Sequence, residues 1–376
     1  MKTEMKKYQD LIQIILFMGI ITGFMAAMFV LKDKTFSEQE NRVLNQTPKV
    51  TVKGITSGKW MEQFEACLTD QFPGRDTWVG IKSYSERLSG KTENNAVFFC
   101  QDDTLIKRFD EPDSELVEKN IMAVNQLVEN TDLPVYFSLI PGAVSIWDEK
   151  LPKYAQNYDQ RALIDEIYSK VNCKTVDTYS RLRQHKNEYI FYRTDHHWTT
   201  RGAYYGSTAI AEAFGMEVEP LDSYSSEVVS DSFYGTVYSS SGVRWVKPDV
   251  IEKFIPKEGK TVQKFVGDTP ADGEFYDYEK LKVKDKYAFF FGGNTPLIKI
   301  TSDTDRDKKL LVIRDSYSDS EIPFLTEYFS EIYMMDLRYY KFGVKYFLEK
   351  YDVDAVLVNY SVSNFVEDKN IVMAGK

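Results

Sequence analysis

The longest apolar run in the chain lies near the N-terminus, where residues 11–31 carry no charged side chain. At about 1.5 Å of rise per residue, a helix of that length is just long enough to cross a hydrocarbon core of about 30 Å. The run is longer than the apolar core of a secretory signal peptide, and Met25-Ala26-Ala27-Met28 is a poor cleavage site. The sequence therefore favours an uncleaved membrane anchor over a signal peptide. Three lysines precede the run and two follow it, so the positive-inside comparison only slightly favours a cytoplasmic N-terminus over residues 1–10.

The segment after the anchor changes in character twice. Residues 32–57 mix charged residues with Asn, Thr and Pro without periodicity, which predicts a stalk and tether. The main domain is expected over residues 58–376. It should begin with helices over 60–67 and 76–88, separated by Phe72-Pro73-Gly74, and a hairpin should follow over 97–106.

From residue 115 onward, apolar segments with helical spacing alternate with short buried runs. The expected helices span 116–128, 162–171, 200–214, 320–329 and 342–351, and the expected strands span 135–140, 175–177, 189–192, 310–313, 332–335 and 355–359. This succession predicts an α/β fold, an open and mainly parallel doubly wound sheet with helices on both faces. Residues 221–300 interrupt the pattern and predict an inserted, partly β region over the site. Within it, short strands are expected at 287–291 and 297–300. Gly292-Gly293-Asn294 is expected in an ordinary hairpin turn, and the alternative is that the glycine pair supplies an oxyanion amide.

Composition and charge exclude one class of partner and leave others open. The net charge of -10 and a pI near 5.1 argue against a nucleic-acid partner, which requires a concentrated basic face. Aromatic residues make up 14% of the chain, which suits either an aromatic-rich core or a surface that stacks on sugars. The three cysteines, Cys67, Cys100 and Cys173, lack metal-binding spacing, allow at most one disulfide and are expected to be inert thiols.

Candidate chemistry concentrates in two short stretches. Asp195-His196-His197-Trp198 holds two of the chain's three histidines. In an extended segment, Asp195 and His197 face one way and His196 faces the other, so the carboxylate can orient His197 as a general base. Far downstream, the buried strand over 310–313 runs into Asp315-Ser316, the kind of strand end at which α/β enzymes place reactive serines.

Each stretch also has a structural reading. A solvated loop or a structural hydrogen bond explains an Asp-x-His pair equally well, and Asp-Ser after a strand is usually a helix N-cap. His185 lies in a polar run and is expected at the surface. Asp70 and Arg75 are either an active-site pair or, in the favoured reading, an ion pair that closes a turn between helices.

These residues resemble a known family. Asp195-His196-His197-Trp198 is similar to the signature of the DHHW family of bacterial proteins, which in turn resembles the SGNH-hydrolase-like domains of alginate O-acetyltransferases. Further blocks agree in family order: residues 70–76, Ile140-Pro141 with Lys150-Leu151-Pro152, and residues 315–318. The resemblance covers nearly everything after the anchor. It implies an SGNH-hydrolase-like domain whose catalytic triad is Asp195, His197 and Ser316. The chain departs from the pattern at Arg314, where the family turn has glycine, and this bears on the oxyanion geometry.

The resemblance also implies a function. It predicts an extracellular O-acetyltransferase that acts on an exopolysaccharide or cell-wall polysaccharide, with a multi-pass membrane acyltransferase as the acetyl donor and without a cofactor or metal. The candidate substrate contacts are Trp198, Arg314, Tyr317 and Asn294. Three alternatives remain open: a carbohydrate acetylesterase with the same triad, a metal-dependent deacetylase, and an anchored polysaccharide-binding protein with Trp198 and Trp245 as stacking platforms. The metal site needs a third protein ligand, for which only His196 or His185 is available.

Overall fold

The chain divides into two compact units, and the first of them ends at Lys91. The computed structural model describes residues 2–376. The first unit runs up to Lys91 and includes Gly242–Arg244, and the second comprises Thr92–Ser241 and Trp245–Lys376. The helices expected at the start of the main domain therefore belong to the N-terminal unit.

The N-terminal unit begins with the apolar helix α1, Lys2–Val30. Among residues 2–376, α1 is the one helix that is long and apolar enough to cross a membrane, over Lys6–Val30, and either a membrane anchor or a signal sequence has this character. The predicted stalk contains short elements: β1 (Phe36–Ser37), β2 (Arg42–Val43) and α2 (Val52–Thr56). Helices α3 (Lys59–Asp70) and α4 (Arg75–Leu88) follow and confirm the two predicted helices.

Asp70 and Arg75 hold the N-terminal unit together. The buried Asp70 carboxylate accepts hydrogen bonds from the Arg42 guanidinium at 2.5 and 2.9 Å and from the backbone and side-chain nitrogens of Asn45, both at 2.8 Å. Its bond to Arg42 holds the pKa of Asp70 well below its usual range. Arg75 bonds to Glu40, and its Nε lies 4.0 Å from Asp70. These contacts tie β1 and β2 to the turn between α3 and α4, so the structural reading of the pair is the one that the geometry supports.

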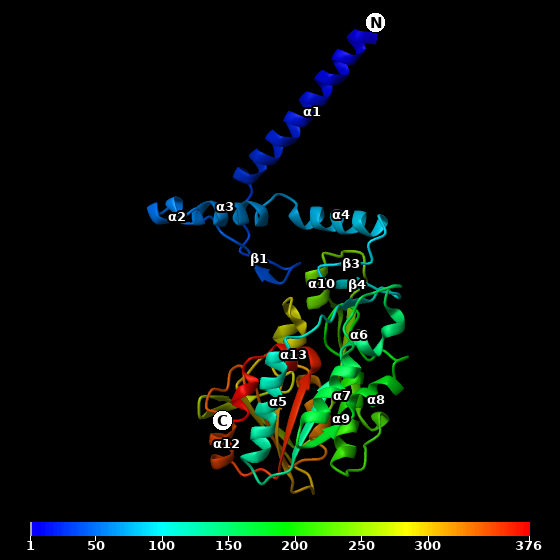
Figure 1. Ribbon diagram of the computed structural model, residues 1–376, viewed down its shortest axis with the longest axis vertical. Helices are drawn as coiled ribbons and strands as arrows, with labels where there is room; N and C mark the ends of the chain where they lie inside the picture. The colour runs from blue at the N-terminus through cyan, green and yellow to red at the C-terminus, as the bar shows by residue number, and fades with distance from the viewer. Residues whose placement is uncertain (1) are drawn as a thin grey trace. The chain divides into compact units, whose positions relative to one another are not determined.

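The second unit is built on an eight-stranded sheet (Figure 1) with the order β11-β10-β12-β14-β13-β15-β6-β7. The strands are β6 (Val135–Ile140), β7 (Lys174–Val176), β10 (Lys260–Val266), β11 (Thr269–Gly273), β12 (Leu297–Ser302), β13 (Lys309–Arg314), β14 (Glu331–Met335) and β15 (Ala355–Ser361). The five strands from β14 to β7 are parallel, as predicted. The three others pair antiparallel at one edge. The inserted region therefore extends the main sheet in addition to forming its own hairpin, β8 (Ser225–Phe233) with β9 (Asp249–Ile255).

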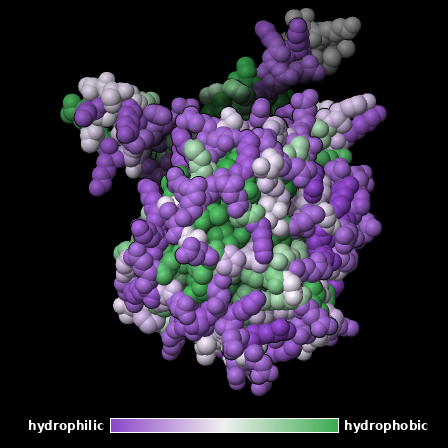
Figure 2. Space-filling view, turned by 60° about the horizontal axis from the view of Figure 1, so that its bottom comes forward, coloured by the Kyte–Doolittle hydropathy of each residue, from purple (hydrophilic) through white to green (hydrophobic). Residues whose placement is uncertain are grey.

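Helices cover both faces of the sheet, and alternate residues of the central strands point into two cores. Leu311 and Ile313 of β13 pack in a core with α5 (Ser114–Glu129), α7 (Gln160–Lys170), α12 (Val344–Lys350) and α13 (Val362–Glu367). Leu310 and Val312 point to the other side, where α9 (Thr200–Ala213) and α11 (Ser318–Leu325) pack. Burial on both faces explains the continuous apolar runs that identify these strands in the sequence. On the face shown in Figure 2, hydrophilic residues cover most of the surface.

Smaller elements complete the unit. A three-stranded sheet of β3 (Glu93–Asn94), β4 (Val97–Phe99) and β5 (Leu105–Lys107) confirms the predicted hairpin. Short helices are α6 (Ala143–Ile146), α8 (Thr178–Gln184) and α10 (Thr236–Ser241).

The three cysteines are free, and burial raises the pKa of Cys100 to about 12 and that of Cys173 to about 11, so these two thiols are poor nucleophiles.

Two predicted strands are wrong. Residues 189–192 form only an isolated bridge, between Phe191 and Trp198. Residues 286–289 form a 3₁₀ turn, and Phe291, Gly292 and Gly293 follow with positive φ values of 56°, 71° and 98°. Phe289, Phe290 and Phe291 are all buried, whereas a strand exposed on one face would bury only alternate residues. The turn expected at Gly292-Gly293-Asn294 is confirmed.

Candidate active site

Ser316 lies in the turn between strand β13 and helix α11, near the carboxyl edge of the parallel strands. The preceding residue, Asp315, fixes this turn. Its Oδ1 accepts a hydrogen bond from the Tyr317 amide at 2.9 Å. Its Oδ2 accepts from the amide and hydroxyl of Ser361, at 2.8 and 2.7 Å, and from Asn364 Nδ2 at 2.8 Å. Asp315 thus ties the turn to the end of β15 and the start of α13, which leaves the Ser316 side chain half-buried at the surface of the sheet edge.

The loop with the two histidines is held by a second buried aspartate, Asp249 of β9. Its Oδ1 accepts from the Arg193 amide at 3.0 Å, and its Oδ2 accepts from the Thr194 amide and hydroxyl at 2.8 and 2.5 Å. At the other end of the loop, the Tyr192 amide donates to the His197 carbonyl at 3.2 Å. The inserted region therefore fixes the backbone on which Asp195 and His197 stand.

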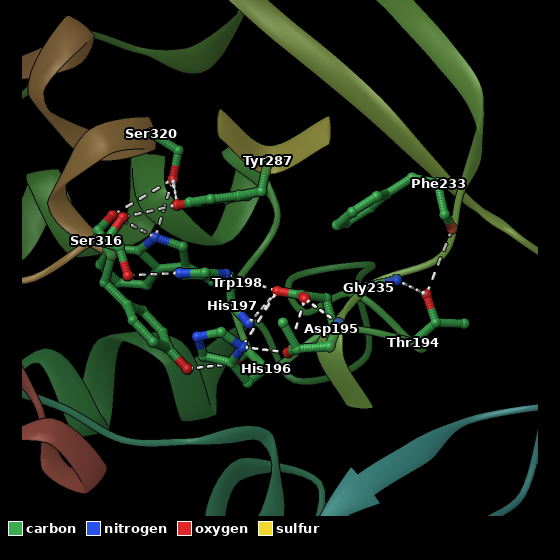
Figure 3. A network of polar contacts seen from close by, with 12 residues as sticks. Thr194, Asp195, His196, His197, Trp198, Phe233, Gly235, Tyr287, Ser316 and Ser320 are labelled. Atoms are coloured by element: carbon green, nitrogen blue, oxygen red, sulfur yellow. Dashed lines mark hydrogen bonds and ion pairs between the residues drawn. The ribbon is translucent and has the colours of Figure 1, made fainter. Parts of the chain in front are cut away.

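The structure brings Asp195, His197 and Ser316 together (Figure 3). His197 Nε2 lies 2.8 Å from Ser316 Oγ, and His197 Nδ1 lies 2.6 Å from Asp195 Oδ1. The Asp195 Oδ1 atom also accepts a hydrogen bond from the His197 amide at 3.0 Å. In this arrangement a carboxylate orients an imidazole, and the imidazole contacts a hydroxyl through its second nitrogen. A hydroxyl, an imidazole and a carboxylate in this order can perform acyl transfer.

Asp195 is buried, yet its surroundings keep it ionised. Burial opposes the charge, but the two histidines and hydrogen bonds from His197 and the Thr236 amide outweigh it and hold the pKa of Asp195 well below its usual range. Thr236 donates to Asp195 Oδ2 through its amide at 2.8 Å and through its hydroxyl at 3.0 Å. Gly235 precedes Thr236, and a Cβ atom at Gly235 would lie 2.2 Å from Asp195 Oδ2. The close approach of this backbone therefore requires glycine.

Tyr287 completes the surroundings of His197, and the sequence did not single it out. Its ring stacks on the imidazole with centroids 3.7 Å apart and planes 8° apart. Its hydroxyl donates to the Ser316 carbonyl at 3.1 Å and lies 3.1 Å from Ser320 Oγ. Tyr287 thus touches both the base and the serine turn. In the sequence, Tyr287 stands out only as part of the aromatic run 287–291, for which the sequence predicts a strand.

His196 does not lie on the opposite side from its neighbours, as the alternation argument predicts. Its ring lies 3.8 Å from that of His197, and its Nδ1 lies 2.6 Å from Thr236 Oγ1. The alternation fails because this segment is a tight loop and not a strand. The His196 side chain is 36% exposed, and partial burial together with the neighbouring His197 lowers its pKa to about 3. His196 is therefore neutral at physiological pH.

A cleft of about 350 Å³ reaches the triad at Asp195, while His197 and Ser316 are not among its lining residues. The residues on its wall include Asp195, His196, Tyr317, Asn364, Lys107 and Glu367. Of the four predicted substrate contacts, Tyr317 lies on this wall. Asn294 is not among the lining residues, and its side chain bonds to Tyr339 and Arg338 instead.

The other two predicted substrate contacts, Trp198 and Arg314, have fully buried side chains and are not among the residues that line the cleft. Trp198 packs beneath the site, and its indole nitrogen donates to the Tyr317 carbonyl at 3.0 Å and to Ser320 Oγ at 3.1 Å. Arg314 directs its guanidinium toward Asp319, at 3.0 Å, and Asp336, at 3.9 Å. The side chain in the place of the family glycine therefore points into the core, and it leaves the cleft open.

The donor atoms of Asp195, His196 and His197 lie within 4.8 Å of one another, close enough to share a metal ion. The hydrogen bonds weigh against this reading. Both nitrogens of His197 already face a partner, Asp195 on one side and Ser316 on the other. The remaining histidine, His185, lies 2.9 Å from Glu188 and stacks on Tyr205, so it adds no ligand to the group.

This chain is similar to several proteins of known structure. A DHHW family protein from Eubacterium siraeum is 26% identical, with a TM-score of 0.66 over 75% of this chain and 95% of that one. Bacillus cereus PatB1, solved with a sulfonyl adduct, is 21% identical, with a TM-score of 0.63 over 74% of this chain and 98% of that one. The O-acetyltransferase domain of Pseudomonas putida AlgJ is 14% identical, with a TM-score of 0.46 over 73% of this chain and 93% of that one.

Among curated protein sequences, none matches this chain. The family model described as "DHHW protein" matches residues 113–335, which is more than half of the chain and includes the loop with Asp195 and His197 and the turn with Ser316. The chain therefore belongs to the DHHW protein family.

Proposed function

We propose that this protein is a serine acyltransferase that moves an acetyl group to a polysaccharide hydroxyl through an acyl-enzyme on Ser316. The observation that carries the proposal is the pair of short contacts at His197, 2.8 Å to Ser316 Oγ and 2.6 Å to Asp195 Oδ1. Neither a binding protein nor a structural hydrogen-bond network needs a hydroxyl, an imidazole and an ionised carboxylate in that order.

The first half-reaction forms the acyl-enzyme. Ser316 Oγ attacks the carbonyl carbon of an ester donor while His197 Nε2 takes the hydroxyl proton. Asp195 stabilises the resulting imidazolium through Nδ1, and the two donors of Thr236 keep the carboxylate in place. When the tetrahedral intermediate collapses, His197 returns the proton to the leaving alkoxide, and the acyl group remains on Ser316.

The second half-reaction runs the same steps with a new hydroxyl. An acceptor hydroxyl loses its proton to His197 and attacks the acyl carbon, and the proton then returns to Ser316 Oγ. Both half-reactions place negative charge on the carbonyl oxygen, which requires hydrogen-bond donors. Within residues 2–376, the Ser316 amide donates no hydrogen bond, so it is available for this role. Tyr287, bonded to the Ser316 carbonyl, holds the next peptide group of the same turn.

The acetyl group, the polysaccharide and the extracellular site rest on the family resemblance of the sequence motifs and on α1. If α1 anchors the chain with its N-terminus in the cytoplasm, the catalytic unit lies outside. Acetyl-CoA is cytoplasmic, so the acyl group must then be passed across the membrane by a partner, a multi-pass acyltransferase. The cleft beside the triad provides space for an acceptor.

The same triad would also serve an acetylesterase, in which water replaces the acceptor. The two functions are distinguished by incubating the protein with a chromogenic acetyl ester, with and without a polysaccharide acceptor. A transferase acetylates the polymer, and the acceptor accelerates donor cleavage. An esterase gives the same rate of free acetate in both cases.

Matched variants test whether the serine is responsible. Ser316→Ala should abolish donor cleavage, whereas Ser330→Ala, a half-buried serine that bonds to the Lys308 carbonyl, should not. Unchanged donor cleavage in Ser316→Ala would overturn the proposal. Binding of the polymer without any cleavage by the wild type would favour the anchored polysaccharide-binding protein.

A further inference from the structure

Helix α4 carries an exposed apolar stripe that the catalytic proposal does not use. Trp78, Ile81 and Leu88 are 48%, 53% and 73% exposed. Their spacing of three and seven residues places them on one side of the helix. The opposite side contains Ser83, which is buried. The helix therefore buries a position on its polar side and exposes its apolar side, the reverse of a helix that covers a core.

The apolar surface continues onto the end of α3. Leu68 and Phe72 are each 38% exposed. Together with Trp78 and Val79 they line an open groove between α3 and α4. Figure 1 shows the two helices end to end, so these residues and the α4 stripe form one elongated surface. We call Leu68, Phe72, Trp78, Ile81 and Leu88 the α3–α4 apolar face.

This face touches the candidate membrane helix. The ring of Phe24 in α1 stacks on that of Phe72, with centroids 5.1 Å apart and planes at 20°, and lies 5.9 Å from that of Trp78. Phe24 is inside the apolar span Lys6–Val30, six residues before its end, which is about 9 Å along the helix axis. Side chains that contact Phe24 therefore lie at the depth of the outer end of the span.

We infer that the α3–α4 apolar face lies in the interface of the membrane that α1 spans. Aromatic residues such as Trp favour this depth, because their rings are apolar and their polar atoms stay near water. The Trp78 indole nitrogen already donates to the Pro73 carbonyl at 3.2 Å, so insertion leaves no unpaired donor. α1 and α4 then hold the N-terminal unit on the bilayer at two places.

The distribution of charged residues along the chain also favours a lipid membrane as the partner of this face. Residues 32–91 contain ten Lys and Arg against eight Asp and Glu, whereas residues 92–376 contain 34 against 47. The segment that follows the anchor is therefore slightly basic in a strongly acidic protein. A basic balance suits a surface of anionic lipid headgroups, which would repel the acidic remainder of the chain.

Tryptophan quenching in vesicles tests the inference. The full chain is reconstituted into vesicles of phosphatidylcholine and phosphatidylglycerol, with or without bromine on the acyl chains. Brominated lipid should quench part of the emission, and Trp78→Phe should lose that quenchable part. Trp60→Phe is the matched control, because Trp60 stacks on Phe64 and donates to the Pro48 carbonyl. It should keep the quenching of the wild type.

A second pair of variants tests the face as a whole. Ile81→Glu with Leu88→Glu should lift α4 from the lipid and restore the Trp78 emission. Val228→Glu, an equally exposed apolar site in the second unit, should not. Flotation of the same samples reports attachment through α1. Protein that floats but shows the same quenching in wild type and Trp78→Phe would overturn the inference while leaving the anchor intact. Protein that does not float would overturn both.

Discussion

The close approach of Gly235 to Asp195 allows a sharp test of how the triad is held. A Cβ atom at position 235 would lie 2.2 Å from both Cβ and Oδ2 of Asp195, where ordinary contacts begin at 3.4 Å. The difference between these two distances is about 1 Å, so Gly235→Ala must displace the Asp195 carboxylate by about that much. Thr236 follows residue 235 directly, so its two donors to the carboxylate shift as well. No titrating or catalytic group is removed, so any effect on the rate arises from position alone.

The expected size of the effect follows from that displacement. A misplacement of about 1 Å costs roughly 10²-fold in rate. Complete loss of the orienting carboxylate would cost roughly 10⁴-fold. The value of kcat for acetyl ester cleavage should therefore fall between these limits. Overpacking a buried site costs about 1–3 kcal/mol, so the protein should remain folded.

The assay is steady-state cleavage of an acetyl ester, with circular dichroism and thermal unfolding to confirm the fold. Gly80→Ala is the control, because the added Cβ there meets only the flexible Arg244 side chain, at 3.1 Å. It should retain the wild-type rate. A folded Gly235→Ala protein with wild-type kcat would refute the claim that the position of Asp195 controls the reaction.

Three further variants probe the surroundings of the triad. Asp195→Asn should lose roughly 10⁴-fold in kcat while the protein stays folded, since an amide holds the imidazole in the wrong tautomer. Tyr287→Phe keeps the ring on His197 but loses the donor to the Ser316 carbonyl, so kcat should fall by no more than about tenfold, the equivalent of one hydrogen bond. Burial raises the pKa of Asp319 from 3.8 to about 7, so the native protein holds a proton that the unfolded chain releases. The contribution of Asp319 to the free energy of unfolding should therefore fall as pH rises from about 4 to 7. Asp319→Asn should remove that contribution, as the difference between wild type and variant in denaturant titrations at several pH values would show.

The sequence predicts the parallel strands well because each is a short apolar run buried on both faces. Residues 135–140 match β6 at both ends, and 310–313 lies within β13. It also pairs Asp195, His197 and Ser316 correctly, although Asp195 does not follow a strand of the sheet. The motif identifies these residues, whereas strand alternation does not describe the position of His196.

What the sequence could not show depends on contacts between distant segments. Asp249 and Thr236, both in the inserted region, fix the histidine loop, and Asn364 holds Asp315 from beyond β15. Each is a common polar residue that acquires its role only when the chain is folded. Trp198 and Arg314 illustrate the converse, since both lie next to reactive groups in sequence and yet turn their side chains into the core.

The most direct test of the account is whether Ser316 becomes acylated. The protein is incubated with an acetyl ester without acceptor, quenched in acid, digested and analysed by peptide mass spectrometry. We predict one acetyl group on the peptide that contains Ser316 in the wild type, and none in His197→Ala, which lacks the base 2.8 Å from Ser316 Oγ. Turnover of the ester with Ser316 unmodified at every time point, or acylation of Ser316 to the same extent in His197→Ala, would contradict the proposed mechanism.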